Sequence, residues 1–416
     1  MKGSKINIFF STLNLLLCVA GYQFVTSIFS FVIPDPESSQ ILTIPYHGFQ
    51  LAICLITIFI NRKNSYNLHN VSKWLFVFWG FLLLRFFYDM YIRSDIFIDS
   101  GTKVMHLMYM IPKTLFEMYA VMKSYKYIDF KKLLTFTYLF FIVACICTFF
   151  SNEVFQSVTN ERASANSALN TIDSGHMGLT TLILSIYLLF YKNTKLWIRI
   201  CIIVMAFFAI IVFLRSGSRG PIFAFIGCVT IWLLSSSKNQ KKSFFVFFVV
   251  LIIGYSLFDS LYSMLENIAP NLFNRFEAYS SVGQIDTRIV NYNYAIQTFL
   301  DNPVFGKDFA EYFTPTTMIY SHNMVLDAFM QLGLMGGLVF IYILIKTVLR
   351  IMEIIKLKLH YSWLGLILIQ NIMRCMLSSS FYFTPIISIL IILIFLPIPN
   401  VNHNKILLKS NLIRHK

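Results

Sequence analysis

Long apolar segments with almost no charge are the feature that most constrains how this chain folds. An α-helix needs about 17 to 25 residues to cross the hydrocarbon core of a bilayer, and the segments have this length. Their apolar residues run continuously instead of alternating with period two, which favours helices over barrel strands. We therefore predict about twelve transmembrane helices, at residues 6–33, 41–60, 74–92, 104–122, 133–150, 176–191, 197–214, 221–236, 243–258, 323–345, 361–380 and 385–399.

The composition agrees with this prediction and excludes a soluble domain. Hydrophobic residues make up 57% of the 416 positions and charged residues only 13%. An average soluble domain carries about 25% charged residues, so roughly half of the usual solvating surface is missing. We expect an all-α fold in which residues 1–416 form a single polytopic membrane domain.

The distribution of charge among the loops predicts the orientation of the chain. With the N-terminus in the cytoplasm, the cytoplasmic segments contain 23 of the 34 Lys and Arg residues but two of the 19 acids. This is the positive-inside pattern of helical membrane proteins, and it places both termini in the cytoplasm. The net charge of +15 then reflects loops that face lipid headgroups and does not indicate nucleic-acid binding.

Two of the predicted external loops are long, at about 151–175 and 259–322. The second is long enough to form a small cap, and it contains a helical pattern from Asp286 to Leu300. Gly306 allows a turn after that helix. We expect the helix to be amphipathic and to lie along the outer membrane–water boundary, so function is expected on this side.

The first candidate site is the turn between the seventh and eighth spans, with the sequence Arg215-Ser216-Gly217-Ser218-Arg219-Gly220-Pro221. Its two arginines occur on the external side, against the positive-inside trend. Gly220 lets the backbone approach a ligand, and the start of the next helix offers free N–H groups. Guanidinium groups beside such N–H groups suit phosphate oxygens. The alternative is an interfacial turn whose arginines reach the headgroups.

The second candidate site is Ser321-His322-Asn323, where the tenth span begins. Ser321 is expected to cap the helix, which would place His322 in its first turn. The helix dipole there favours a neutral imidazole that can accept a proton. The alternative for His322 is an interfacial histidine in a structural hydrogen bond.

A polar stripe continues below this histidine. Asn323, Asp327 and Gln331 follow at intervals of four, and polar groups at that depth face a bundle interior or a wet cavity. Asp327 is five residues beyond His322, so we do not assign it to orient the imidazole. Gly333 and Gly337 are expected to allow close helix packing.

Several further charged residues lie in or near the spans. Arg288, in the first turn of the cap helix, either contacts phosphate or sugar or pairs with a surface acid. The i,i+4 spacing of two pairs predicts mutual neutralisation on one helix, with a transport relay as the alternative. These pairs are Arg85 with Asp89 and Lys113 with Glu117. Arg374 has no obvious partner in the sequence.

Taken together, these residues resemble the bacterial O-antigen polymerases of the Wzy type and the related O-antigen ligases. The resemblance rests on three features, namely Ser218-Arg219-Gly220 opening a span, Arg288 heading a short helix in a large external loop, and His322-Asn323 followed by nine residues and Gly333. It covers about 205–345, and the predicted span count agrees over the full length.

The resemblance implies a helical-bundle glycosyltransferase of the bacterial cytoplasmic (inner) membrane, with its active site on the external side. The implied substrate is an oligosaccharide on undecaprenyl pyrophosphate, with no metal or other cofactor. The implied partners are membrane lipid, a chain-length regulator and a flippase, and not nucleic acid. The family's catalytic residues correspond to Arg219, Arg288 and His322. Binding of pyrophosphate and sugar is assigned to Arg215, Gly220, Asn323, Asp327 and Arg374.

Three functions follow as hypotheses. We favour a polymerase of lipid-linked repeat units, because a nearly bare membrane bundle of this length resembles the polymerases. A ligase that transfers polymer to a lipid A-core acceptor shares the same residues and differs in the acceptor. A transporter or flippase of lipid-linked sugars is the third hypothesis, against which stand the absence of two evident halves and the polar load on one loop.

Overall fold

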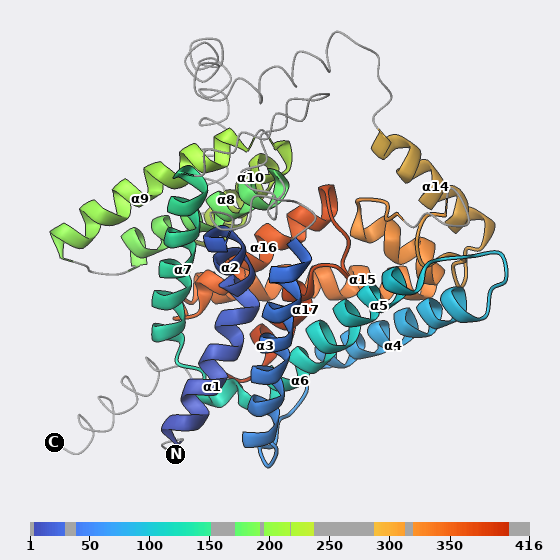
Figure 1. Ribbon diagram of the computed structural model, residues 1–416, viewed down its shortest axis with the longest axis horizontal. Helices are drawn as coiled ribbons and strands as arrows, with labels where there is room; N and C mark the ends of the chain where they lie inside the picture. The colour runs from blue at the N-terminus through green and yellow to red at the C-terminus, as the bar shows by residue number, and fades with distance from the viewer. Residues whose placement is uncertain are drawn as a thin grey trace, which may run out of the picture.

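The computed structural model describes residues 4–29, 39–150, 171–191, 195–216, 218–236, 287–312 and 319–398. Within these ranges the chain is helical apart from turns and one isolated β-bridge. Figure 1 shows the helices gathered around α16 (Ser362–Leu377) and α17 (Pro385–Phe395), which lie near the middle of the view. The all-helical architecture expected from the sequence is confirmed for the described residues.

Seven helical segments are long and apolar enough to cross a membrane. The first is Lys5–Phe29, which consists of α1 (Lys5–Leu16), the π-helical turn η1 (Leu17–Gly21) and α2 (Tyr22–Phe29). The other six lie in α3 (Ser39–Ile60), α4 (Asn70–Tyr91), α7 (Phe130–Phe150), α8 (Thr171–Tyr191), α9 (Leu196–Arg215) and α15 (Met324–Lys356).

The predicted count of twelve spans is not confirmed. The helix α10 (Arg219–Ser236) and helices α16 and α17 are apolar but shorter. The predicted span 104–122 is divided into α5 (Ser100–Met110), the π-helical turn η3 (Ile111–Phe116), and α6 (Glu117–Ser124). Pro112 lies at this break. Because proline has no backbone N–H, it removes one of the hydrogen bonds that continue an α-helix. A 3-10 turn, η4 (Tyr125–Tyr127), follows, and the predicted span 243–258 lies outside the described residues.

Aromatic side chains fill the centre of the bundle. Trp79 of α4 is fully buried, and its indole N–H donates to Ser388 Oγ of α17 at 3.0 Å. Phe78 of α4 stacks on Phe340 of α15, with ring centroids 4.9 Å apart. Aromatic pairs of this kind add stabilisation beyond the burial of their area. Helices α4, α15 and α17 therefore share one core, and it supports the candidate site.

Segments expected in the cytoplasm meet at one end of the bundle. The N–H of Asp129 donates to a threonine of α1 at 3.0 Å, and Lys123 Nζ donates to the carbonyl oxygen of Asn64 at 3.0 Å. The ring of Phe130, at the start of α7, lies 5.5 Å from that of Tyr361, which follows α15. This grouping of basic loops agrees with the predicted orientation, and the sidedness itself remains a prediction.

The long helix α15 is interrupted at Gly333, which has φ 63° and ψ −157°. A Cβ atom at this position would lie 2.4 Å from the carbonyl oxygen of Val304. The N–H of Leu334, freed by the break, donates to the carbonyl oxygen of Pro303 at 2.7 Å. The expected close approach at Gly333 therefore occurs, but its partner is the turn that follows α14, inserted into the helix, and not a second helix.

Helix α14 (Thr287–Asp301) confirms the helix predicted at 286–300. Gly306 has φ +67°, which confirms the predicted turn. Phe299 of α14 packs edge-on against Phe329 of α15, with centroids 5.2 Å apart. In Figure 1, α14 lies at the edge of the bundle, on the far side of the view from α8, α9 and α10. Its place at the membrane boundary remains a prediction.

Candidate functional site

The turn that carries His322 precedes α15 and does not belong to it. The prediction that Ser321 caps the helix is wrong, because the cap is Asn323, whose Oδ1 accepts the N–H groups of Val325 and Leu326 at 3.0 and 3.2 Å. Asn323 competes better for this position because its side chain reaches both N–H groups. His322 consequently lies just outside the helix.

His322 has φ 61°, a left-handed conformation that a non-glycine residue seldom adopts. Histidine tolerates this region better than most residues, and such strained positions cluster at functional sites. Its half-buried ring lies edge-on to the ring of Tyr320, with centroids 4.6 Å apart. The ring of Tyr320 in turn packs against that of Phe383, just before α17, with ring centroids 5.9 Å apart. The imidazole is therefore held at the surface of an aromatic cluster.

Asp327 supports the His322 turn through its neighbour. Its Oδ1 accepts the N–H of Ser321 at 3.0 Å and the hydroxyl of Ser321 at 2.7 Å. Asp327 is 2% exposed, and its Oδ2 has no hydrogen-bond partner in the described part of the chain. The carboxylate therefore fixes the backbone beside His322 and does not bond the imidazole itself, as the sequence predicted. Gln331, lower in the stripe, donates to the carbonyl oxygen of Phe309 at 2.7 Å.

Sequence reasoning missed Glu311, which lies close to this turn. Its backbone pairs with that of Ile319 in both directions, at 2.7 and 3.1 Å. The side chain is fully buried, and neither carboxylate oxygen has a hydrogen-bond partner among the described residues. Burial, and then the nearby Asp327 carboxylate, raise the pKa of Glu311 to about 8. Nothing in the sequence distinguishes this acid from other loop acids.

The second group of polar residues surrounds the turn between α9 and α10. Arg219 begins α10 and is half-buried. A Cβ atom built at Gly220 would lie 3.4 Å from Ser378 Oγ and 3.8 Å from His176 Nε2. Ser378 closes α16, and His176 is in the second turn of α8. The arginine turn is thus packed against the ends of two other helices at the same end of the bundle.

His176 and Asp173 were also missed by the sequence analysis. His176 is 4% exposed, and neither ring nitrogen has a hydrogen-bond partner in the described part of the chain. Asp173, one turn earlier, forms an ion pair with Arg374 of α16. Asp173 is therefore the partner of Arg374 that the sequence did not reveal. It lies about 200 residues earlier in the chain, in the first turn of α8.

The predicted arginines do not all lie together. Arg215 is exposed at the end of α9 and rests over the ring of Phe149 at 5.8 Å, the geometry of a cation–π contact. Arg288 lies in the first turn of α14, and Figure 1 shows α14 and α10 well apart. Arg219 and Arg374 share one neighbourhood, and Tyr320, beside His322, is within electrostatic range of Arg374.

The intramembrane charges of α4 hold the inserted segment in place. Arg85 and Asp89 do approach one another, at 3.9 Å, but their stronger contacts lie elsewhere. Arg85 donates to four backbone carbonyl oxygens at 3.0–3.1 Å, those of Gln331, Phe305, Gly306 and Lys307. Asp89 accepts the N–H of Phe309 at 2.6 Å. Neutralisation within one helix is therefore a minor part of their role.

The predicted pair of Lys113 with Glu117 is wrong. Lys113 Nζ lies 2.8 Å from His47 Nε2 and 3.6 Å from the centroid of the Tyr109 ring. Glu117 accepts a hydrogen bond from Asn14 at 2.7 Å and a second from Gln50. Because each charged group finds partners on other helices, their i,i+4 spacing does not determine their contacts.

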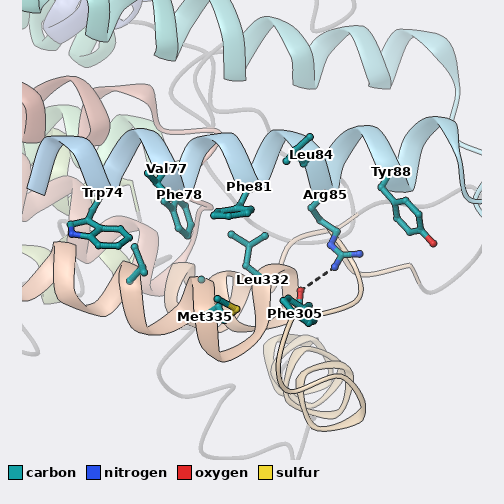
Figure 2. A pocket seen from close by; sticks show the side chains of 12 residues that line it. Trp74, Val77, Phe78, Phe81, Leu84, Arg85, Tyr88, Phe305, Leu332 and Met335 are labelled. Atoms are coloured by element: carbon teal, nitrogen blue, oxygen red, sulfur yellow. Dashed lines mark hydrogen bonds between the residues drawn. The ribbon is translucent and has the colours of Figure 1, made fainter.

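An apolar groove of about 530 Å³ opens between α4 and α15. Figure 2 shows Trp74 and Phe81 of α4 facing Met335 and Leu332 of α15 across the groove. Arg85 closes one end by reaching to the carbonyl oxygen of Phe305. On α15 the groove begins at Leu332, about two and a half turns from the Asn323 cap that follows His322.

One comparison with known proteins gives a match. Residues 204–341 match the family model described as O-antigen ligase. No curated protein and no solved structure matches the chain. The matched segment contains both predicted motifs, the Arg219 turn and the His322 turn, as well as Arg288. It supports the resemblance to the O-antigen polymerase and ligase family of membrane enzymes. Among the described residues, no group of three or more His, Cys, Asp or Glu side chains could hold a metal.

Proposed function

We propose that the chain polymerises oligosaccharide repeat units carried on undecaprenyl pyrophosphate, at the outer face of the bacterial cytoplasmic membrane. His322 carries this proposal, because it lies in a left-handed turn within the matched segment and its backbone is fixed from both sides. The Asn323 cap follows it, and Ser321, bound to Asp327, precedes it. A strained and braced histidine at a bundle end suits catalysis better than a structural role.

The proposed reaction is a displacement at the anomeric carbon of the donor sugar. His322 accepts the proton of the acceptor hydroxyl, and the oxygen then forms a bond to the anomeric carbon. The bond from that carbon to the phosphate oxygen breaks, and the electron pair leaves with the polyprenyl diphosphate. Guanidinium groups stabilise the charge that develops on the departing diphosphate, so the arginine positions matter as much as the base. Arg219 is the proposed donor at the start of α10, and Arg288 is proposed to join it from α14, which lies apart from α10 in this structure.

The experiment uses purified full-length protein in detergent micelles with a synthetic lipid-linked repeat unit. We expect polymer from the unaltered protein and none from Arg219→Ala, Arg288→Ala or His322→Asn. Asparagine is chosen because it tolerates the left-handed backbone and keeps the turn intact while removing the base. Arg62→Ala, at the opposite end, is the matched control and should leave polymer unchanged. Full-length polymer from all three site variants would refute the assignment.

A ligase remains the second candidate, because the matched family model is described as O-antigen ligase. Both activities displace the same diphosphate and differ in the acceptor. Deletion of the gene separates them. Loss of a polymerase leaves single repeat units on their final acceptor, whereas loss of a ligase leaves long chains on the lipid carrier.

A further inference from the structure

A polar cavity of about 190 Å³ lies inside the bundle, between the first helices and the last ones. It is lined by η1, α2, α3, the α5–η3 junction, the start of α8, the end of α16 and the start of α17. At about 30 Å³ for each water molecule, the space would hold roughly six, which is room for a phosphate or diphosphate group. Its polar lining sets it apart from the groove between α4 and α15.

The cations that line this cavity are incompletely neutralised. Lys113 has an imidazole and an aromatic ring as its contacts, neither of which carries negative charge. Arg374 pairs with Asp173, but its Nε is buried without a hydrogen-bond partner among the described residues. Within the described lining there are thus two cations and one acid. Buried charge without a counter-charge is costly, and intramembrane ionisable groups usually mark a pathway or a ligand.

Neutral hydrogen-bond donors complete the lining. Tyr22 and Tyr109 both line the cavity. Asn371 lines it too, and its amide gives one of its two N–H groups to the carbonyl oxygen of Ile367 at 2.8 Å, whereas the amide of Gln50 already donates to Glu117. Cations combined with hydroxyl and amide donors are the chemistry that holds phosphate oxygens, and arginine suits them especially well. An apolar or a cationic ligand would gain nothing from Lys113 and Arg374, so the lining selects an anion.

The cavity also adjoins both clusters of the candidate site. On one side, Asp173 belongs to the same helix start as His176, which packs beside the Arg219 turn. On the other side, the ring of Tyr109 contacts Phe383 at 5.1 Å, and Phe383 contacts Tyr320. Tyr320 is the ring against which His322 packs.

We propose that Lys113 and Arg374 bind the diphosphate group of the lipid-linked donor in this cavity, an inference that rests on the proposed function. Lys113 belongs to the N-terminal half of the chain, outside the matched segment 204–341. The site is therefore completed by helices that the family match does not cover. His47 and Tyr109 hold the Lys113 ammonium in place and act as positioning residues.

The test is direct binding of radiolabelled farnesyl diphosphate to the purified full-length protein in detergent, measured by equilibrium dialysis. We expect saturable binding that Lys113→Met weakens at least tenfold and that Lys113→Arg largely retains. The matched control is Lys103→Met, on α5, whose ammonium lies over the Tyr91 ring and outside the cavity. Melting temperature and gel filtration establish that each variant is folded.

Competition identifies the recognised group. Unlabelled farnesyl diphosphate should displace the probe best, inorganic diphosphate and farnesyl monophosphate less well, and farnesol least. The proposal is overturned if folded Lys113→Met binds within twofold of the unaltered protein, if farnesol competes equally, or if the unaltered protein does not bind.

The His322→Asn variant separates this proposal from the proposed function. It should bind farnesyl diphosphate normally and make no polymer. Binding that depends on Lys113, in a protein that makes no polymer from lipid-linked repeats, would sustain the cavity and refute the enzyme. Polymer formation by a Lys113→Met variant at the normal rate would sustain the enzyme and refute the cavity.

Discussion

The apolar groove between α4 and α15 and the polar cavity beside α16 each contain an intramembrane arginine, and the two arginines are bonded very differently. Arg85, at the groove, donates hydrogen bonds to four backbone carbonyl oxygens, three in the inserted segment and one at the break in α15. Arg374, at the cavity, has one acid as its partner and a buried Nε without a hydrogen bond in the described chain. Both are charges that the bilayer disfavours.

The difference teaches that an intramembrane charge indicates a ligand only when its own donors are unsatisfied. A guanidinium group whose hydrogen bonds are all made by the protein works as a structural clamp. A guanidinium group with an unused donor, in a cavity that also contains a lysine with no acidic partner, is suited to bind an anionic ligand. Removing a clamp should therefore lower the free energy of unfolding more than removing a charge that binds a ligand.

The largest effect is expected for Arg85→Met. The variant removes four hydrogen bonds to carbonyl oxygens, of which that of Lys307 alone keeps a second, longer bond from Arg93 at 3.5 Å. At about 1 kcal/mol for each hydrogen bond, the loss is roughly 4 kcal/mol. Thermal unfolding in detergent measures it. Arg62→Met, which removes an exposed guanidinium over the Phe59 ring, should cost less than about 1 kcal/mol. Equal melting temperatures for the two variants would contradict the clamp.

Gly333→Ala should follow, with a loss of about 3 kcal/mol. The new methyl group meets the carbonyl oxygen of Val304 at 2.4 Å, and the residue keeps a positive φ with a ψ of −157°, a region essentially restricted to glycine that costs other residues about 1–3 kcal/mol. Gly80→Ala on α4 is the matched control, because nothing lies within 4 Å of its added Cβ. That change should stabilise the helix slightly. A neutral Gly333→Ala would mean that the inserted segment is not rigid.

A smaller and pH-dependent effect is expected for Glu311. Its folded-state pKa of about 8 exceeds the unfolded value of about 4.3, so the folded protein binds the proton more tightly. This contribution to stability is complete below about pH 4.3 and is lost as the pH rises through about 8. The free energy of unfolding should fall by about 2 kcal/mol between pH 6 and 8.

Glu311→Gln should remove that part of the slope. Melting temperatures from pH 6 to 9 in one detergent would measure it, with Glu353→Gln at the other end of α15 as the control. An unchanged slope in Glu311→Gln would show that the carboxyl group is solvated or paired.

The smallest effect on stability is expected for Lys113→Met without ligand, because methionine fills a similar volume and removes a buried charge. The melting temperature should be equal to that of the unaltered protein or slightly higher. A ligand at a hundred times its dissociation constant stabilises a protein by about 2.7 kcal/mol, and one at ten times by about 1.4 kcal/mol. At the same concentration, farnesyl diphosphate should therefore raise the melting temperature of the unaltered protein more than that of a variant that binds it at least tenfold more weakly. A large loss in the unliganded variant would make Lys113 a second clamp, like Arg85.

The sequence predicted the elements that local pattern determines. Apolar length identified the long helices, and helical spacing located α14 to within a residue or two. The glycine after α14 was correctly assigned to a turn because its neighbours are turn-forming residues. The break in α15 could not be predicted, since a glycine inside an apolar helix is usually tolerated.

The candidate site was predicted only in part, because spacing along the chain does not determine contacts between distant segments. Motif order predicted the Arg219 and His322 turns, and both lie within the matched segment 204–341. The partners of Arg374, Lys113 and Arg85 come from residues up to about 250 positions away, or from backbone carbonyl oxygens. No spacing rule addresses such contacts, so the pairing of Lys113 with Glu117 was wrong and Glu311 was missed.

The segment inserted at Gly333 also bears on the position of Arg288. It joins the last residue of α14 to the interrupted backbone of α15, so α14 is attached to the bundle at the C-terminal end of α14. A rotation about that attachment displaces Arg288, at the opposite end of α14, further than the residues near the pivot. In the proposed reaction, Arg288 would therefore contact the diphosphate from the end of α14 that is farthest from this attachment.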